Sequence, residues 1–157
     1  MKKLILLVVG VFTFHGCVDQ QSSEVVFTMS NDTDKNVRVL AFNTMNYIGE
    51  VYDIPKQADE IIIEPNSSYK VTRYTGLDDN VGYAFYSRLA VDYIRIIFND
   101  ERIKVYTLAE AAGTPDISVF RGEGSNGDYR HIITEEDYNT AEVCDPDCET
   151  HGELPGK

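Results

Sequence analysis

Short runs of strand-forming residues, separated by polar turns, occupy most of the chain between residues 24 and 134. The apolar and β-branched runs are 24–29, 37–42, 61–63, 69–75, 91–98, 103–108, 117–120 and 129–134, with Asn, Asp, Gly, Pro and Ser clustered between them. Turn signals recur about every eight to twelve residues, and no long segment has helical periodicity. This pattern predicts an all-β fold, a single antiparallel β-sandwich spanning residues 24–140.

The strongest predicted strand is 91–98. Its alternation places Asp92, Ile94, Ile96 and Phe98 on one face and Val91, Tyr93, Arg95 and Ile97 on the other. The polar segment 99–102 then predicts a hairpin with 103–108, and 31–36 predicts another between 24–29 and 37–42. The strand runs 117–120 and 129–134 flank a Gly-rich loop, in which Asn126-Gly127 is a strong hairpin-turn signal.

Helical structure is predicted at only two places. Residues 109–113 suit a single helical turn. Thr134 supplies a hydroxyl cap and is followed by three acids that suit the positive end of a helix dipole, so a short helix is expected there. From residue 141 to 157 the chain is acidic and polar, which predicts a loose tail.

The N-terminus has the pattern of an export signal. Lys2 and Lys3 precede an uncharged apolar run, 4–14, which as a helix reaches only about 16 Å, half of a bilayer's hydrocarbon thickness. A positive start, a short apolar run and a small Gly16 are typical of a cleaved signal peptide. The segment Phe14-His15-Gly16-Cys17 resembles the lipobox of bacterial lipoproteins, with Phe14 and His15 departing from its usual Leu and small residue. The alternative is an ordinary signal peptide followed by an unrelated cysteine.

These features divide the chain into a lipoprotein signal peptide (1–16), a lipidated tether (17–23) beginning at Cys17, the sandwich domain (24–140) and the acidic tail (141–157). Cleavage removes Lys2 and Lys3 only, so the formal net charge changes from −12 to −14 over the remaining 141 residues. Such a charge repels nucleic acid and anionic lipid surfaces. We therefore expect no nucleic-acid partner and attachment to the membrane through the lipid alone.

Two segments resemble small lipoproteins of the Bacteroidota. They are Val91-Asp92-Tyr93-Ile94-Arg95-Ile96-Ile97-Phe98-Asn99-Asp100-Glu101-Arg102 and Ile133-Thr134-Glu135-Glu136-Asp137-Tyr138-Asn139 with its nearby cysteine. The resemblance extends in layout over 24–148. It implies an envelope lipoprotein with an immunoglobulin-like β-sandwich, and it carries no catalytic residue to transfer.

Cys144-Asp145-Pro146-Asp147-Cys148 is the most specific chemical motif. If Cys17 carries lipid, two cysteines remain, and they can form one disulfide in the oxidising compartment that an exported protein enters. We expect a Cys144–Cys148 disulfide that holds the tail in one turn. The alternative adds His151 to the two cysteines as zinc ligands, but a fourth ligand at a suitable spacing is missing.

Other candidate sites are weaker. Asp32, Asp34 and Asn36 alternate like the first ligands of a calcium loop, but Val37 and Asn43 stand where an EF-hand has its Gly and its bidentate Glu. The Gly-rich loop 122–127 lacks the Lys and helix of a phosphate cradle. We therefore predict a hydrated turn and a hairpin loop, with no metal and no cofactor.

No catalytic motif is present. The chain has neither His-Glu-x-x-His nor Gly-x-Ser-x-Gly, and we interpret His131 as a structural histidine and Glu135 and Glu136 as helix-start acids. The ten tyrosines are the remaining feature; those near 47–52 and 83–93 are interpreted as packing residues, with a recognition face as the alternative.

The sequence thus predicts a non-enzymatic binding or structural module, anchored by lipid, with a protein or glycan partner that the residues do not identify. The alternatives are a toxin-neutralising or inhibitor-like lipoprotein and a small hydrolase without a recognisable motif. Val18 follows the candidate lipid-bearing cysteine, whereas an Asp there would resemble an inner-membrane retention signal. We therefore expect an outer-membrane location, facing either the periplasm or the surface.

Overall fold

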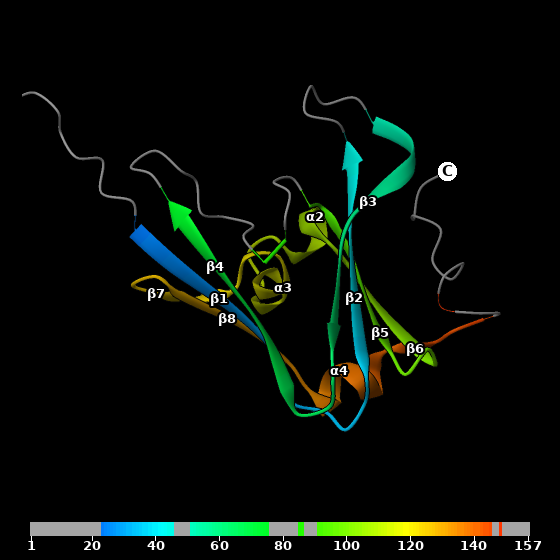
Figure 1. The fold of residues 1–157 in the computed structure, drawn as a ribbon. Helices are drawn as coiled ribbons and strands as arrows, with labels where there is room; N and C mark the ends of the chain where they lie inside the picture. Colours follow the sequence, from blue (N-terminus) through cyan, green and yellow to red (C-terminus); the bar gives the residue numbers. More distant parts are fainter. Residues whose placement is uncertain (1–22, 46–50, 76–84, 87–90, 146–147, 149–157) are drawn as a thin grey trace, which may run out of the picture.

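The strands form two sheets that pack face to face (Figure 1). The structure, a computed structural model, describes residues 23–45, 51–75, 85–86, 91–145 and 148. The first sheet has the order β4 (Ser67–Thr75), β1 (Ser23–Asn31), β8 (Asp128–Ile133) and β7 (Glu123–Ser125); the second has β3 (Val51–Ile63), β2 (Val37–Met45), β5 (Tyr93–Phe98), β6 (Arg102–Thr107) and β9 (Glu142–Val143). The predicted all-β sandwich is confirmed.

The connections between strands differ in part from the prediction. The hairpin expected between the first two runs is wrong, because β1 and β2 lie in different sheets and the turn between them crosses from one sheet to the other. The turn between β3 and β4 also crosses. The predicted β5–β6 hairpin is confirmed. The second predicted hairpin is confirmed only in its turn, with Asn126 and Gly127 at positive φ, because the strand that pairs with β8 is β7, within the predicted loop, and not the run 117–120. One pair of neighbouring strands, β1 and β8, is parallel. The sequence predicted antiparallel pairing throughout, and it is wrong for this pair.

Helical segments are few and short in the described part of the chain. They are α2 (Leu108–Ala111), the 3-10 helix η1 (Pro115–Ile117), α3 (Ser118–Arg121) and α4 (Glu135–Thr140). The expected strand at 117–120 is helical instead, because Pro115 starts η1 and the turn of α3 buries Val119 and Phe120 completely in the core. The helix expected at Thr134 is confirmed as α4, with a capping box between Thr134 and Asp137.

The core lies between the two sheets. Its residues come from alternate positions of β1, β2, β3 and β5, with Phe85 added from a loop and Val119 and Phe120 from α3. The alternating members are Val25, Phe27, Met29, Val37, Val39, Ala41, Ile61, Ile63, Ile94, Ile96 and Phe98. Phe27 illustrates the packing, because its ring stacks on Tyr129 at 5.2 Å between centroids and meets Phe85 edge-on at 5.6 Å. The predicted inward face of the strand 91–98 is confirmed at Ile94, Ile96 and Phe98.

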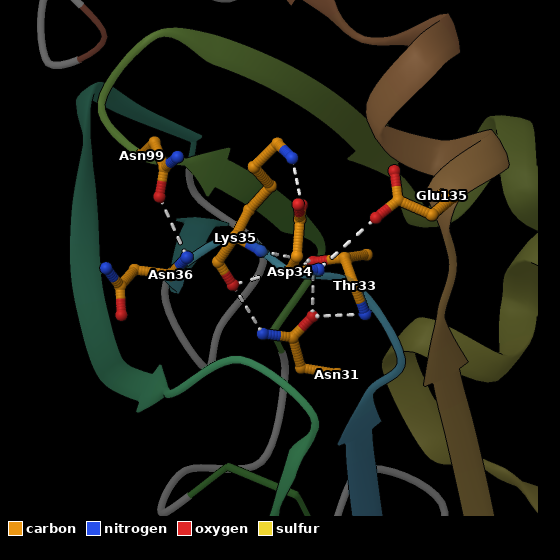
Figure 2. A network of polar contacts seen from close by, with 7 residues as sticks. All are labelled: Asn31, Thr33, Asp34, Lys35, Asn36, Asn99 and Glu135. Carbon is orange, nitrogen blue, oxygen red and sulfur yellow. Dashed lines mark hydrogen bonds and ion pairs between the residues drawn. The ribbon is translucent and has the colours of Figure 1, made fainter.

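A fully buried asparagine, Asn31, joins the two crossing turns. Figure 2 shows its contacts with Thr33 and Lys35 in the first of them. The amide nitrogen of Asn31 donates to the carbonyl oxygens of Lys35 at 2.8 Å, Ile63 at 3.2 Å and Glu64 at 3.0 Å, and its oxygen accepts from the backbone N–H and the hydroxyl of Thr33. Ile63 ends β3 and Glu64 begins the β3–β4 turn. Asn31, the last residue of β1, therefore fastens the two sheets together. The turn that follows it lies beside α4, since the backbone N–H of Asp34 donates to Glu135.

The beginning of the acidic tail is seated on the sandwich. β9 pairs with β6, and the backbone N–H of Cys144 donates to the carbonyl oxygen of Glu101 at 3.0 Å. Cys148 is buried against a second apolar cluster on the outer face of the larger sheet, made by Leu40, Ile97 and Ile103. Residues 149–157 lie outside the described residues.

We expect Asn31→Ala to lower the free energy of unfolding by about 3 kcal/mol, because the substitution leaves buried carbonyl groups without a donor. Urea denaturation of the purified protein measures the change. Asn36→Ala is the matched control: Asn36 lies in the same turn with an exposed side chain, and its replacement should change stability by less than about 0.5 kcal/mol. Equal effects of the two substitutions would contradict the role given to Asn31.

Replacing both Cys144 and Cys148 by Ser should lower the free energy of unfolding by about 2 kcal/mol, the amount that chain entropy gives for so short a loop. The pairing also holds the segment after β9 in place locally, so hydrogen exchange at Glu142 and Val143 should become faster by more than the global loss of stability explains. A rise at these two amides no larger than the rise in β1 would contradict this local role.

Candidate functional site

The residues singled out from the sequence do not meet in one place. Cys17 lies outside the described residues, as do His151, Tyr47 and Tyr83. Cys144 and Cys148 lie at disulfide distance, with their Cα atoms 4.9 Å apart, within the range that disulfides adopt. Because each sulfur is engaged with the other, the zinc alternative loses two of its three ligands.

Of the three alternating residues in the β1–β2 turn, Asp34 is engaged by the neighbouring lysine. Lys35 forms an ion pair with the carboxylate of Asp34, and the backbone N–H of Asp34 donates to the carboxylate of Glu135 at 3.2 Å (Figure 2). The hydrogen bond from Lys35 lowers the pKa of Asp34. Across the part of the chain that the structure describes, no group of three or more His, Cys, Asp or Glu side chains could hold a metal ion.

The described aromatic residues from the predicted cluster are packing residues. Phe85, Tyr86 and Tyr93 are all buried, and the hydroxyl of Tyr86 donates to the carbonyl oxygen of Val119 at 2.8 Å. Tyr93 meets Phe42 edge-on at 5.6 Å, and the guanidinium of Arg95 lies over both rings. The packing interpretation is confirmed for these three residues.

A cavity of about 390 Å³ is lined by residues of β6, η1, α3, β7, β8 and α4. Its polar lining comes from distant parts of the chain: Tyr106, Asp116, Ser118, Glu123, Arg130, His131 and Asp137. The volume is within the range of small-molecule sites. This cavity is the candidate functional site.

A buried serine–histidine pair lies at the inner side of the cavity. His131 points inward from β8, and its Nδ1 lies 2.7 Å from the hydroxyl oxygen of Ser118, the first residue of α3. The other ring nitrogen, Nε2, is buried and has no hydrogen-bond partner among the described residues. An unpaired buried polar atom is rare in folded proteins and costs free energy.

Burial keeps His131 neutral. Loss of hydration lowers the pKa of its imidazole from 6.5 to about 4, and the nearby carboxylates of Asp137 and Asp116 only partly offset this effect. The ring is therefore uncharged at neutral pH, so one of its nitrogens carries a proton and the other has a free lone pair.

Asp137 organises the side of the cavity formed by α4. Its Oδ1 accepts from Lys104 at 2.7 Å, and its Oδ2 accepts from the backbone and hydroxyl of Thr134 in the capping box. Burial opposes ionisation of Asp137, but these hydrogen bonds outweigh it and the pKa is lowered. Tyr106 also donates to Oδ1, at 3.4 Å, and burial together with the Asp137 charge raises the pKa of its phenol.

Sequence reasoning placed His131 among structural histidines and did not connect it with Ser118. The two are 13 residues apart, and Ser118 lies in a segment that was expected to be a strand. The only available signal was the alternation of 129–134, which places His131 on the same inward face as Tyr129 and Ile133 and so predicts a buried imidazole.

No protein family, curated protein or solved structure matches this chain. None of the helices in the described residues is long and apolar enough to cross a membrane. The cavity is therefore interpreted from its own geometry.

Acidification should destabilise the protein in the pH range where His131 titrates. The unfolded chain binds a proton near pH 6.5 and the folded chain only near pH 4, so the stabilisation is present above pH 6.5 and is lost as the pH falls to about 4. The expected loss is about 3 kcal/mol. Urea denaturation from pH 7 to pH 4 measures it, and His131→Phe should remove this part of the pH dependence. An unchanged dependence in that variant would exclude His131 as its source.

Proposed function

We propose that this chain is an exported envelope lipoprotein whose sandwich is a non-enzymatic binding module. Cleavage before Cys17 and lipidation of its sulfur would leave the domain on the short tether 17–23. The observation that carries the proposal is the cysteine that follows Gly16, close behind a short apolar run with a positive start. Val18 after that cysteine supports sorting to the outer membrane.

The disulfide pair supports export independently of the signal. Disulfides form and persist in oxidising compartments and are rare in the cytosol. Cys144 and Cys148 lie at disulfide distance, and Cys148 is buried. The strongly negative mature chain supports attachment through lipid, because the protein surface is repelled by anionic headgroups.

Binding is favoured over catalysis by the state of His131. A serine nucleophile needs a base that takes its proton, and an imidazole with a pKa of about 4 is a weak base at neutral pH. A carboxylate usually orients the other ring nitrogen, whereas Nε2 has no partner in the described part of the chain. The cavity is better suited to holding a ligand than to attacking one.

A hydrolase remains the second candidate because Ser118 and His131 are in hydrogen-bond contact. A fluorophosphonate probe separates the two candidates. We expect no covalent labelling of Ser118, with Ser118→Ala as the matched control. Labelling that disappears in this variant would favour the hydrolase.

Metabolic labelling with a fatty-acid analogue tests the anchor. We expect label on the wild-type chain and recovery with the outer membrane, and Cys17→Ala should lose both because no other thiol stands at the cleavage point. Cys144→Ser with Cys148→Ser is the matched control and should keep the label. A labelled, membrane-bound Cys17→Ala protein would disprove lipidation at this residue. Recovery of the wild type with the inner membrane would disprove the proposed outer-membrane location.

A further inference from the structure

Four strands form the edges of the two sheets, and three of them are poorly suited to pairing with an added strand. β7 has three residues and β9 has two, so both are short. β3 is interrupted by register shifts and carries Lys56, Asp59 and Glu60, and bulges and charges are devices that protect natural edges. β4 is different, because its nine residues pair with β1 without a shift and include neither proline nor an acid. β4 is therefore the edge open to strand addition.

The direction of the backbone groups of β4 follows from that of β1. The N–H of Val26 donates to the carbonyl oxygen of Gly127, on the β8 side of β1. Because successive strand residues direct their backbone groups to alternate sides, the odd-numbered residues of β1 bond to β4, where they lie opposite odd-numbered residues. The even-numbered residues of β4 direct their N–H and C=O groups away from the sheet. Three of them, Ser68, Lys70 and Thr72, are exposed, and no strand of the described chain pairs with this side of β4.

Two apolar side chains beside this edge are incompletely covered. Tyr69 and Val71 point inward from β4 and pack against the core, but both remain partly exposed. Their neighbours on β1, Met29 and Phe27, are fully buried between β4 and β8. A strand added at the edge would cover Tyr69 and Val71 in the same way, so backbone hydrogen bonding and apolar burial both favour the addition.

We propose that the added strand is β4 of a second copy of this chain, paired antiparallel about a two-fold axis at Val71. Val71 is the middle residue of β4, so this register pairs the whole strand. It places Lys70 opposite Thr72 of the other copy and Arg73 opposite the other copy's Tyr69, and no two like charges are directly opposite. The two smaller sheets then form one continuous sheet, and a single patch serves both copies, as in most symmetric dimers.

The net charge of the chain sets a limit on this association. Each copy has a formal charge of −12, which opposes approach at long range. Salt screens this repulsion beyond about 8 Å at physiological ionic strength, and β4 itself adds no acid to the interface. The inference goes beyond the proposed lipid anchor and does not depend on it, since the pairing surface lies within the sandwich.

Cysteine cross-linking of the full chain in isolated membranes tests the register. In Val71→Cys the two sulfurs meet across the axis, because opposite residues without mutual hydrogen bonds have Cα atoms about 4.5 Å apart. Tyr69→Cys is the matched control, since its equivalent lies four residues along the other strand, about 14 Å away. We expect mild oxidation to give at least about tenfold more disulfide-linked dimer with Val71→Cys than with Tyr69→Cys. A non-reducing gel measures the yield, and mass spectrometry identifies the linked cysteines.

A proline substitution tests the role of the backbone. Thr72→Pro removes an outward N–H that the β1 ladder does not use, so adding it to Val71→Cys should abolish the linked dimer. Thr72→Ala keeps the N–H and should keep the cross-link. Circular dichroism should show the same strand content in both variants, and the comparison of Val71→Cys with Tyr69→Cys does not depend on either.

The proposal is overturned if Val71→Cys gives no dimer, or no more dimer than Tyr69→Cys. It is also overturned if the cross-link survives in a folded Thr72→Pro variant, or if Val71→Cys links to a different protein, which would assign the edge to another partner. None of these outcomes bears on lipidation, which the Cys17→Ala experiment decides separately.

Discussion

The buried amide of Asn31 is the constraint on which the arrangement of the two sheets depends. The chain crosses between sheets in two turns, after β1 and after β3, and Asn31 hydrogen-bonds to backbone groups of both. An apolar side chain of similar size would leave three carbonyl groups without this donor in a buried region. The turn after β1 also contacts α4, because the backbone N–H of Asp34 donates to the carboxylate of Glu135. The same helix begins with the capping box and carries Asp137 of the cavity lining, so the turn and the cavity share one element.

The cavity follows from that arrangement. β8 is held against β1 in parallel register, which turns His131 inward opposite Met29, while α4 brings Asp137 to Lys104 and Tyr106 of the other sheet. A polar cluster therefore spans the gap between the sheets beside a fully apolar core. Burial opposes the charged form of both His131 and Asp137. His131 stays neutral because the carboxylates of Asp137 and Asp116 only partly offset the loss of hydration, whereas Asp137 stays ionised because the hydrogen bonds from Lys104 and Thr134 outweigh it.

Much of the fold was predictable because alternation, turn residues and caps are local signals. The inward face of 91–98, the Asn126-Gly127 turn, the start of α4 at Thr134 and the Cys144–Cys148 pair were all predicted from neighbouring residues. The pairing of strands was not, since a polar turn looks the same whether it closes a hairpin or crosses between sheets. The helical turn of α3 also escaped the pattern, because burial of Val119 and Phe120 overrides their preference for strands.

The sequence by itself determined the strand content, the short apolar N-terminal run before Cys17 and the negative charge, because each depends on residue type and spacing alone. Only the tertiary structure decided that β1 lies beside β8, that Asn31 ties two distant turns, and that Ser118 meets His131. These are contacts between residues 13 to about 100 positions apart, and their selection depends on which faces are buried together. The candidate site belongs to that second group, since its groups come from β6, η1, α3, β8 and α4 and share no motif along the chain.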